Sequence, residues 1–348
     1  ETVSAIVSGA KADPLPAVSA QHPNILAIMN ESWADFEDFG NITLSESTMD
    51  YIKSLDNAVV GHAYTSVFGA GTSTSEFEFL TGDSMAFLPS GSIPYQQYIL
   101  GASDSLATLL KGYGYEARAF HPGEKTSWQR NIAYPRLGFD SFKCGDDMDV
   151  PQTDEHGYVS DDSDFRQVIW EFEHKQEGTP LFLFNVTIQN HGGYEDEDYE
   201  TTVQVNEASG EYPQAEQYLS LTKKSDEALE YLIDYFSQVE EPTLILLFGD
   251  HQPQVASNFY TDVLGTAPDT ALAQKKQMVP FVLWANYDIP EAQGVELSLN
   301  YLSALLMDTA NLPMTGYQKY LARLWKAAPV INTVGIRDAG GNWYGENE

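Results

Sequence analysis

The stretch Leu244–Val255, LILLFGDHQPQV, decides the fold. Its apolar run Leu244–Phe248 has no polar alternation, as expected of a strand that is covered on both faces of a parallel sheet. Gly249 lets the backbone turn directly after this run. The stretch therefore places Asp250 and His251 at the carboxyl end of a buried strand, where open α/β sheets carry their chemistry.

The pair of Asp250 and His251 has two interpretations. An aspartate oxygen and a histidine nitrogen together form half of a site for a hard-to-borderline metal ion. The same pair can also serve only to satisfy backbone groups at a strand end, and the pair alone favours this simpler interpretation. The metal hypothesis gains weight because other strand ends of the chain carry matching chemistry.

Two further predicted strands end in polar residues. Residues 24–29 (NILAIM) predict the first core strand, and Glu31 follows it as a second carboxylate or as a cap of the next helix. Residues 181–188 (LFLFNVTI) predict another buried strand, and His191 follows that one. Taken alone, His191 is most simply a residue that hydrogen-bonds its own turn.

Another strand is predicted over residues 115–120, and three residues near its end suit a polar headgroup. His121, Trp128 and Arg130 all lie within ten residues of its end. Arg130 would bind a phosphate, and Trp128 would form a wall of the pocket. An arginine stacked on a surface tryptophan is an equally good interpretation of the local sequence.

A glycine-rich turn follows the strand predicted over residues 59–68 and leads into a helix. Thr72 or Ser73 lies where the N-cap is expected, and Glu76 stands three residues after Ser73, the spacing of a capping box. The same position suits a nucleophile, because a hydroxyl at a helix N-terminus lies in a positive field beside free N–H groups.

Strand and helix patterns alternate along the chain, which predicts an α/β fold with a mostly parallel sheet sandwiched by helices. Residues 1–21 indicate a linker, 22–310 the main domain, and 311–348 a small C-terminal antiparallel subdomain with a hairpin over 333–348. Residues 144–164 and 195–211 are predicted to be acidic loops. The remaining elements are a strand over 279–285 and helices over 103–112, 164–174, 213–238 and 297–308.

The charge balance excludes some partners. The 348 residues include 18 basic and 51 acidic side chains, which gives a net charge of −33. Such a field repels nucleic acid and offers no polybasic contact to an anionic membrane. An anionic substrate therefore needs a local device, such as a metal ion or a few well-placed Arg and His residues. The single cysteine, Cys144, excludes an internal disulfide and a thiolate metal cage.

The motifs resemble, in their order along the chain, a known family. They are Asn-Glu-Ser at Glu31, Gly-Thr-Ser-x-Ser-Glu-Phe at Thr72, Asn-His-Gly at His191 and Gly-Asp-His at Asp250. From about residue 24 to the strand at residue 280, the chain is similar to the extracellular catalytic domain of the lipoteichoic acid synthase and phosphoglycerol transferase group. That group belongs to the alkaline phosphatase and sulfatase superfamily. The resemblance implies a sulfatase-like catalytic domain on the extracellular face of the cell membrane, with a membrane anchor preceding this chain.

The resemblance also implies a metal site. Glu31, Thr72, Asp250 and His251 match the family's ligands to one divalent ion, and Thr72 matches its nucleophile. This oxygen-rich set with one nitrogen suits manganese or magnesium and permits zinc, and we expect manganese.

The remaining motif residues match the family's substrate contacts. His191 resembles the phosphate-contacting histidine, which would also act in catalysis, and His121, Trp128 and Arg130 resemble the headgroup-binding set. The implied reaction moves glycerophosphate from phosphatidylglycerol to a glycan or polyglycerophosphate acceptor through a phospho-threonine intermediate. Gly71 stands where lipoteichoic acid synthases have a lysine, and Gln252-Pro253 looks more like a glycan-modifying branch.

Other functions compete with this one. A metal-dependent phosphodiesterase or phosphatase would use the same first half-reaction with water as the acceptor. A sulfatase is disfavoured because Cys144 lies outside any Cys/Ser-x-Pro-x-Arg motif, and a phosphoethanolamine transferase is disfavoured because one cysteine cannot form its disulfides. A non-catalytic extracellular binding domain would have lost at least one of the metal ligands, and all four are present.

Overall fold

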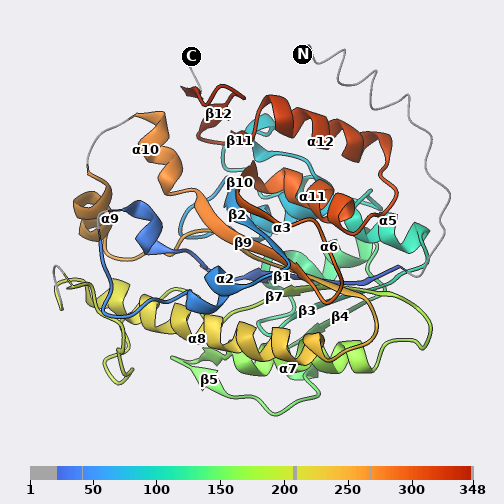
Figure 1. The fold of residues 1–348 in the computed structure, drawn as a ribbon, viewed down its shortest axis with the longest axis horizontal. Coiled ribbons are helices and arrows are strands. Elements are labelled where there is room, and N and C mark those ends of the chain that lie inside the picture. The colour runs from blue at the N-terminus through green and yellow to red at the C-terminus, as the bar shows by residue number, and fades with distance from the viewer. Residues whose placement is uncertain (1–21, 41, 207–209, 266–268, 346–348) are drawn as a thin grey trace.

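An eight-stranded sheet forms the centre of the computed structural model, which describes residues 22–40, 42–206, 210–265 and 269–345 (Figure 1). The linker predicted over residues 1–21 lies outside the described residues. Seven strands run parallel and β9 alone runs against its neighbours, so the predicted mostly parallel α/β sheet is confirmed. The strands, in spatial order, are β10 (Ala292–Ser298), β2 (Ala58–Tyr64), β9 (Met278–Ala285), β8 (Thr243–Gly249), β1 (Asn24–Asn30), β7 (Leu181–Val186), β3 (Glu116–His121) and β4 (Ser141–Cys144).

Helices cover both faces of this sheet, which explains why the central strands are apolar on both sides. Every residue of β1, β7 and β8 is buried. One layer contains α3 (Thr72–Thr81), α5 (Leu106–Gly112), α6 (Arg130–Arg136), α11 (Leu302–Thr309) and α12 (Gly316–Ala327). The other contains α2 (Asp50–Ser54), α7 (Asp161–Glu173) and α8 (Pro213–Ser237).

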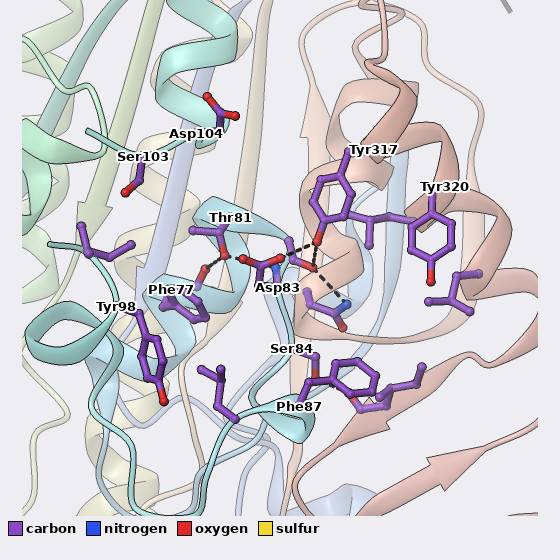
Figure 2. Close-up of a pocket in the computed structure, with 17 residues that line it drawn as sticks. Phe77, Thr81, Asp83, Ser84, Phe87, Tyr98, Ser103, Asp104, Tyr317 and Tyr320 are labelled. Carbon is purple, nitrogen blue, oxygen red and sulfur yellow. Dashed lines mark hydrogen bonds between the residues drawn. The ribbon is translucent and has the colours of Figure 1, made fainter. Parts of the chain in front are cut away.

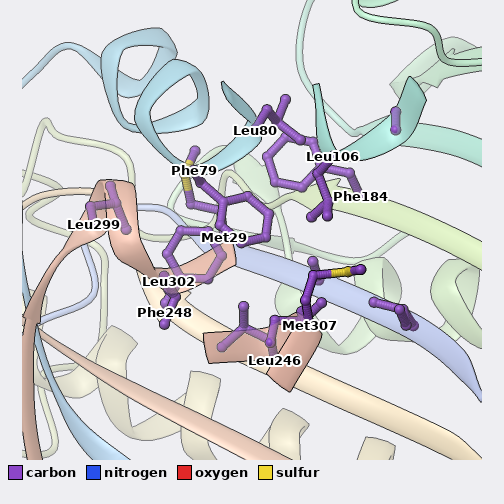
Figure 3. Packing of buried hydrophobic residues seen from close by; sticks show 14 of the residues in the cluster. Met29, Phe79, Leu80, Leu106, Phe184, Leu246, Phe248, Leu299, Leu302 and Met307 are labelled. Atoms are coloured by element: carbon purple, nitrogen blue, oxygen red, sulfur yellow. The ribbon is translucent and has the colours of Figure 1, made fainter. Parts of the chain in front are cut away.

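Helix α3 is held on the sheet by aromatic packing (Figure 3). The ring of Phe79 lies 4.8 Å from that of Phe248 and 5.7 Å from that of Phe184, between centroids. These contacts join α3 to β7 and β8, the strands whose ends carry candidate site residues. The packing of Phe79 therefore also fixes where the N-terminus of α3, at Thr72, meets the sheet.

A small antiparallel sheet ends the described chain, as predicted, although it has three strands instead of a hairpin. Its strands are β11 (Val330–Asn332), β12 (Gly335–Arg337) and β13 (Trp343–Gly345). The domain boundary at residue 311 stays a prediction. The shorter elements are α4 (Pro94–Gln97), α9 (Ser257–Leu264), α10 (Thr270–Lys275), β5 (Asp154–Glu155), β6 (Tyr158–Val159), and the 3-10 turns η1 (Phe36–Phe39), η2 (Met85–Phe87), η3 (Ser127–Gln129), η4 (Gly145–Asp147) and η6 (Leu299–Tyr301).

Three local predictions are wrong in part. The helix predicted from residue 297 starts later, because Leu297 and Ser298 pair with β2 as the end of β10. The acidic loop 144–164 contains β5 and β6, and α7 already begins at Asp161 with Ser160 as its N-cap. The acidic insertion 195–211 buries Val203 and Val205, although residues 207–209 lie outside the described part.

Within the described residues, no helix combines the length and the apolarity that a membrane crossing requires.

Glu78 on α3 predicts a pH-dependent stability. Burial raises the pKa of this carboxyl from 4.5 to about 7, against the opposing effect of donors from Met85 N and Ser66 Oγ. The folded state thus holds a proton that the unfolded state releases, and it loses about 3 kcal/mol of stability as the pH rises from 4.5 past 7. We expect Glu78→Gln to match the wild type at pH 5 and to exceed its free energy of unfolding at pH 8, measured by urea denaturation. Equal stability at pH 8 would contradict this prediction.

Candidate active site

The first carboxylates of the site come together because β1 and β8 are parallel neighbours. Asn30 pairs with Gly249 in their register, so the residues that follow emerge side by side at one sheet edge. The backbone N–H of Ser32 donates to Asp250 Oδ1 at 2.7 Å, and the Ser32 hydroxyl donates to Glu31 Oε1 at 2.8 Å. One serine in the Asn-Glu-Ser turn therefore fixes both carboxylates.

Glu31, Asp250 and His251 form a buried cluster that can hold a metal ion. One donor atom from each lies within 4.8 Å of the others, and these side chains are at most 5% exposed. Thr72 Oγ1 lies 3.4 Å from Glu31 Oε2, so the predicted nucleophile adjoins the same cluster. The structure thus brings together all four residues that the sequence predicts as ligands.

The chemistry of this cluster fits a divalent cation. His251 Nδ1 lies 3.0 Å from the carbonyl of Gln252, which can only accept, so Nδ1 carries the proton and Nε2 keeps its lone pair for the cluster. Asp250 Oδ2 is buried and has no hydrogen-bond partner within the described residues. Burial, reinforced by the charge of Glu31, raises the pKa of Asp250 to about 7. A cation would compensate this buried negative charge.

The turn before α3 frees the Thr72 hydroxyl. The predicted capping box is wrong, because Gly71 is the N-cap residue, Thr72 is the first helical residue, and no side chain caps the helix. Gly71 has φ +104, and a Cβ there would lie 3.0 Å from Val67 Cγ1, so glycine suits this position on both counts. Thr72 consequently presents its hydroxyl at the positive end of α3 without using it as a cap.

A cavity of about 280 Å³ opens over the cluster. Seven of the eight predicted site residues line it, and the eighth, Asp250, is fully buried beside His251. The seven are Glu31, Thr72, His121, Trp128, Arg130, His191 and His251. The predicted headgroup residues therefore face the same space as the predicted nucleophile.

His121 offers a hydrogen-bond acceptor to this cavity. Its Nδ1 lies 2.8 Å from the carbonyl of Val186, so the proton is on Nδ1 and Nε2 is unprotonated. Burial, with a contribution from Arg130, holds the pKa of His121 well below 6.5. A neutral imidazole of this kind can accept a hydrogen bond from an alcohol.

Trp128 reaches the cavity through a strained turn. Trp128 and Gln129 have φ values of 56° and 62°, the left-handed region that side-chain-bearing residues rarely adopt. Such backbone strain concentrates at functional sites. His191 lines the same cavity from an exposed turn after β7, with Nδ1 3.1 Å from the hydroxyl of Tyr158.

Glu76 anchors Arg130, a role that the sequence pattern does not reveal. Its Nε and Nη2 donate to Glu76 Oε1 at 2.8 and 2.6 Å, and the Tyr134 hydroxyl donates to Glu76 Oε2 at 2.7 Å. Glu76 is 0% and Arg130 2% exposed, so the ion pair is buried, and the surface stacking of Arg130 on Trp128 is not what fixes it. The local spacing predicts a helix cap for Glu76, and no local signal indicates a partner 54 residues away.

Removing the charge of Glu76 tests this anchoring. We expect Glu76→Gln to raise KM for a glycerophospholipid donor about tenfold or more, because a charge-assisted hydrogen bond is worth roughly 1.5–3 kcal/mol. Stability should also fall, by about 3–5 kcal/mol, because the buried Arg130 loses its partner. Glu78→Gln, a buried glutamate on the same helix, is the matched control for KM. A folded Glu76→Gln protein with an unchanged KM would show that Arg130 does not need this anchor.

A fully buried polar network connects the turns that carry Glu31 and His191. Asp161 Oδ2 accepts from Asn30 Nδ2 at 2.9 Å and from the Ser225 hydroxyl at 2.6 Å. Asn190 Nδ2 donates to Asn30 Oδ1 at 3.0 Å and to Ser225 Oγ at 2.9 Å. Because Asn30 precedes Glu31 and Asn190 precedes His191, this network connects the turns that carry two site residues on neighbouring strands.

Sequence comparison identifies the family to which this fold and this site belong. The chain belongs to the Sulfatase family, whose family model matches residues 23–312. The fold is alkaline-phosphatase-like: a protein of the alkaline phosphatase superfamily from Vibrio parahaemolyticus superimposes with a TM-score of 0.67 at 18% identity, over 90% of this chain and 75% of that one.

Solved transferases share the fold. A phosphoglycerol transferase of Streptococcus pyogenes, GacH, in complex with sn-glycerol-1-phosphate, has a TM-score of 0.75 at 18% identity, covering 94% of this chain and 84% of that one. The lipoteichoic acid synthase LtaP of Listeria monocytogenes has a TM-score of 0.66 at 13% identity, covering 97% and 91%.

A curated relative is more similar in sequence. A putative cyclic beta-1,2-glucan modification protein of Rhizobium meliloti is 33% identical over 334 residues, which cover 92% of this chain and 51% of the relative. The chain spans about half or less of the length of the curated relatives that it matches.

Proposed function

We propose that the protein is a metal-dependent phosphoglycerol transferase, which moves glycerophosphate from phosphatidylglycerol to a cell-envelope glycan. The observation that carries this proposal is the shared cavity. The Thr72 hydroxyl adjoins the cluster of Glu31, Asp250 and His251, and the headgroup set lines the same 280 Å³. That volume suits a small polar headgroup better than a long chain.

The metal ion would be held by Glu31, Asp250, His251 and the Thr72 oxygen. The oxygen-rich ligand set favours manganese, with magnesium and zinc as the other candidates. When bound, such an ion supplies Lewis-acid stabilisation of phosphate charge and lowers the pKa of a hydroxyl that it contacts. The net charge of −33 makes this contribution more important, since few cations are otherwise available to an anionic headgroup.

The chain's own residues would perform the transfer in two steps. The Thr72 hydroxyl gives its proton to solvent as Oγ1 forms a bond to the phosphorus of phosphatidylglycerol, and the bond from phosphorus to the diacylglycerol oxygen breaks. His191, at the open side of the cavity, would give the departing oxygen its proton. An acceptor hydroxyl then attacks the glycerophospho-threonine and gives its proton to His191. The bond from phosphorus to Thr72 Oγ1 breaks, and Oγ1 regains a proton from solvent.

The headgroup would be oriented by the other side of the cavity. His121 Nε2 accepts a hydrogen bond from a glycerol hydroxyl, and Trp128 forms a wall. Arg130, held by Glu76, contributes positive charge to a cavity that the cluster makes acidic. These three residues would select glycerophosphate over phosphate groups that lack a polar alcohol.

A glycan is the acceptor that we infer. The Rhizobium meliloti relative is described as a putative cyclic beta-1,2-glucan modification protein, and Gln252-Pro253 departs from the teichoic acid pattern. The donor lipid would place the domain on the extracellular face of the cell membrane, anchored by a segment that precedes this chain in the full protein.

A product assay tests the proposal. The protein is incubated with phosphatidylglycerol, Mn²⁺ and cyclic beta-1,2-glucan, and the glucan is analysed by mass spectrometry. We expect one or more glycerophosphate additions to the glucan, with diacylglycerol released in equal amount. Diacylglycerol with free glycerophosphate and unmodified glucan would instead identify a hydrolase, and no diacylglycerol at all would refute the donor.

A further inference from the structure

A second and larger cavity, of about 700 Å³, lies at the opposite end of α3 from Thr72 (Figure 2). We call it the α3–α12 groove; it is lined by the end of α3, the turn that follows it, the segment after α4 and helix α12. Figure 2 shows Tyr98 on one side and Tyr317 and Tyr320 on the other, with Thr81 and Asp83 between them. Thr81, the last residue of α3, lines the groove and lies about 14 Å along the helix axis from Thr72.

Exposed aromatic rings concentrate at this groove. Phe87 is 73%, Tyr98 42% and Tyr317 43% exposed, and all three line it. Leu100, beside the rim in sequence, is 68% exposed. Among the described residues eight large apolar side chains are exposed, and three of these eight line this one groove. A concentration of exposed apolar surface of this kind marks a binding site.

The groove also contains hydrogen-bond acceptors, and one of them has no donor among the described residues. Asn300 lines it, is 3% exposed, and its Oδ1 has no hydrogen-bond partner within the described residues, while its Nδ2 donates to the Gly82 carbonyl at 3.3 Å. The carboxylates of Asp83 and Asp104 also line the groove, and Asp83 Oδ1 accepts from the Tyr317 hydroxyl at 2.7 Å. The occupant must therefore bring donors.

The charges of the groove decide between ligand classes. None of the described residues that line it is a lysine or an arginine, and two are aspartates. With a net charge of −33 for the whole chain, this surface repels phosphate, nucleic acid and anionic lipid headgroups. A neutral carbohydrate meets each requirement, because its C–H faces stack on aromatic rings and its hydroxyls donate to carboxylate and amide oxygens.

We propose that the α3–α12 groove binds a neutral glycan and holds a remote part of the acceptor polymer. Its role as an acceptor subsite rests on the function proposed above, whereas the binding itself does not. The position supports the connection: Tyr98 directly follows α4, and α4 packs against η3, which carries Trp128 at the active-site cavity. A glycan chain that crosses α4 would thus join the two cavities.

Binding of the glucan can be measured without any donor lipid. Cyclic beta-1,2-glucan is titrated into the wild-type protein and into Phe87→Ala/Tyr98→Ala by isothermal calorimetry. We expect the double variant to bind at least about fivefold more weakly, since it loses two aromatic stacking surfaces. Both side chains are exposed, so their removal should leave the fold intact. Tyr231→Ala, a similarly exposed tyrosine on α8, is the matched control and should bind as the wild type does.

Two results would overturn the proposal. One is equal glucan affinity in the wild type and the double variant. The other is binding of zwitterionic phosphatidylcholine vesicles, lost in the double variant, in place of glucan binding; that result would assign the groove to a lipid surface. Glucan binding that depends on the groove in a protein without transferase activity would refute only the function proposed above, whereas transfer to glucan without groove-dependent binding would refute only this inference.

Discussion

Thr72→Ala should lose at least about a thousandfold in turnover of phosphatidylglycerol, because removal of a covalent nucleophile leaves only the residual effects of binding and electrostatics. The fold should persist, since Thr72 is the first residue of α3 and its hydroxyl does not cap the helix. The release of diacylglycerol, followed by chromatography, measures the loss. The circular dichroism spectrum and thermal midpoint of the variant should match those of the wild type.

Two neighbouring substitutions sharpen this prediction. Thr72→Ser keeps a hydroxyl in place and should retain measurable turnover. Thr74→Ala removes a buried threonine hydroxyl from the same helical turn and should remain active, because Thr74 does not line the active-site cavity. Retained activity in Thr72→Ala, or an equal loss in Thr74→Ala, would contradict the assignment of the nucleophile.

Asp250→Asn should abolish the stabilisation of the protein by Mn²⁺. A ligand that binds only the native state raises its stability by RT ln(1 + [L]/Kd), so a hundredfold excess over Kd adds about 2.7 kcal/mol. Asparagine leaves one oxygen where the carboxylate has two, and Asp250 Oδ2 is the buried atom without a hydrogen-bond partner among the described residues. We expect the Mn²⁺ affinity to fall by at least roughly a hundredfold, measured as the shift in thermal midpoint across a Mn²⁺ titration.

The metal-free variant provides the second part of this test. Burial and Glu31 both disfavour the charged form of Asp250, so a neutral amide should be tolerated without metal. Asp250→Asn should therefore be at least as stable as the wild type in the presence of a chelator. Asp226→Asn, a buried carboxylate on α8 away from the cavity, should retain the full Mn²⁺ shift. An undiminished shift in Asp250→Asn would exclude this cluster as the metal site.

The candidate site can be predicted from the amino-acid sequence because its residues stand directly after apolar runs. Parallel strands place their carboxyl ends at one edge of a sheet, so Glu31, His121, His191 and Asp250 are expected to converge. The register of β1 against β8 provides this convergence, with Asn30 opposite Gly249.

The features that local sequence does not predict depend on contacts between distant residues. Glu76 matches a capping-box spacing locally, yet its carboxylate binds Arg130, and only the packing of α6 beside α3 creates that pair. The end of β10 resembles a helix in sequence because Leu297 begins an apolar pattern that fits both periods. Leu297 pairs with Ala63 of β2, and this contact, which no local pattern encodes, makes the segment a strand.

The α3–α12 groove also depends on contacts between residues that are distant in the sequence. Its rings come from segments that are more than two hundred residues apart, Phe87 and Tyr98 on one side and Tyr317 on the other. In the sequence, nothing distinguishes these three residues from other aromatic residues. Only the packing of α12 beside the end of α3 turns them into one surface.

A covalent intermediate on Thr72 would identify both the nucleophile and the donor in one experiment. The wild-type protein is incubated with phosphatidylglycerol and Mn²⁺ without an acceptor, and its intact mass is measured beside that of Thr72→Ala. We predict a mass increase of one glycerophosphate on the wild type alone, located on Thr72 by peptide mapping. An unmodified wild type, under conditions in which Mn²⁺ binds and diacylglycerol is not released, would contradict the proposed transfer through Thr72; so would an adduct on Thr72→Ala.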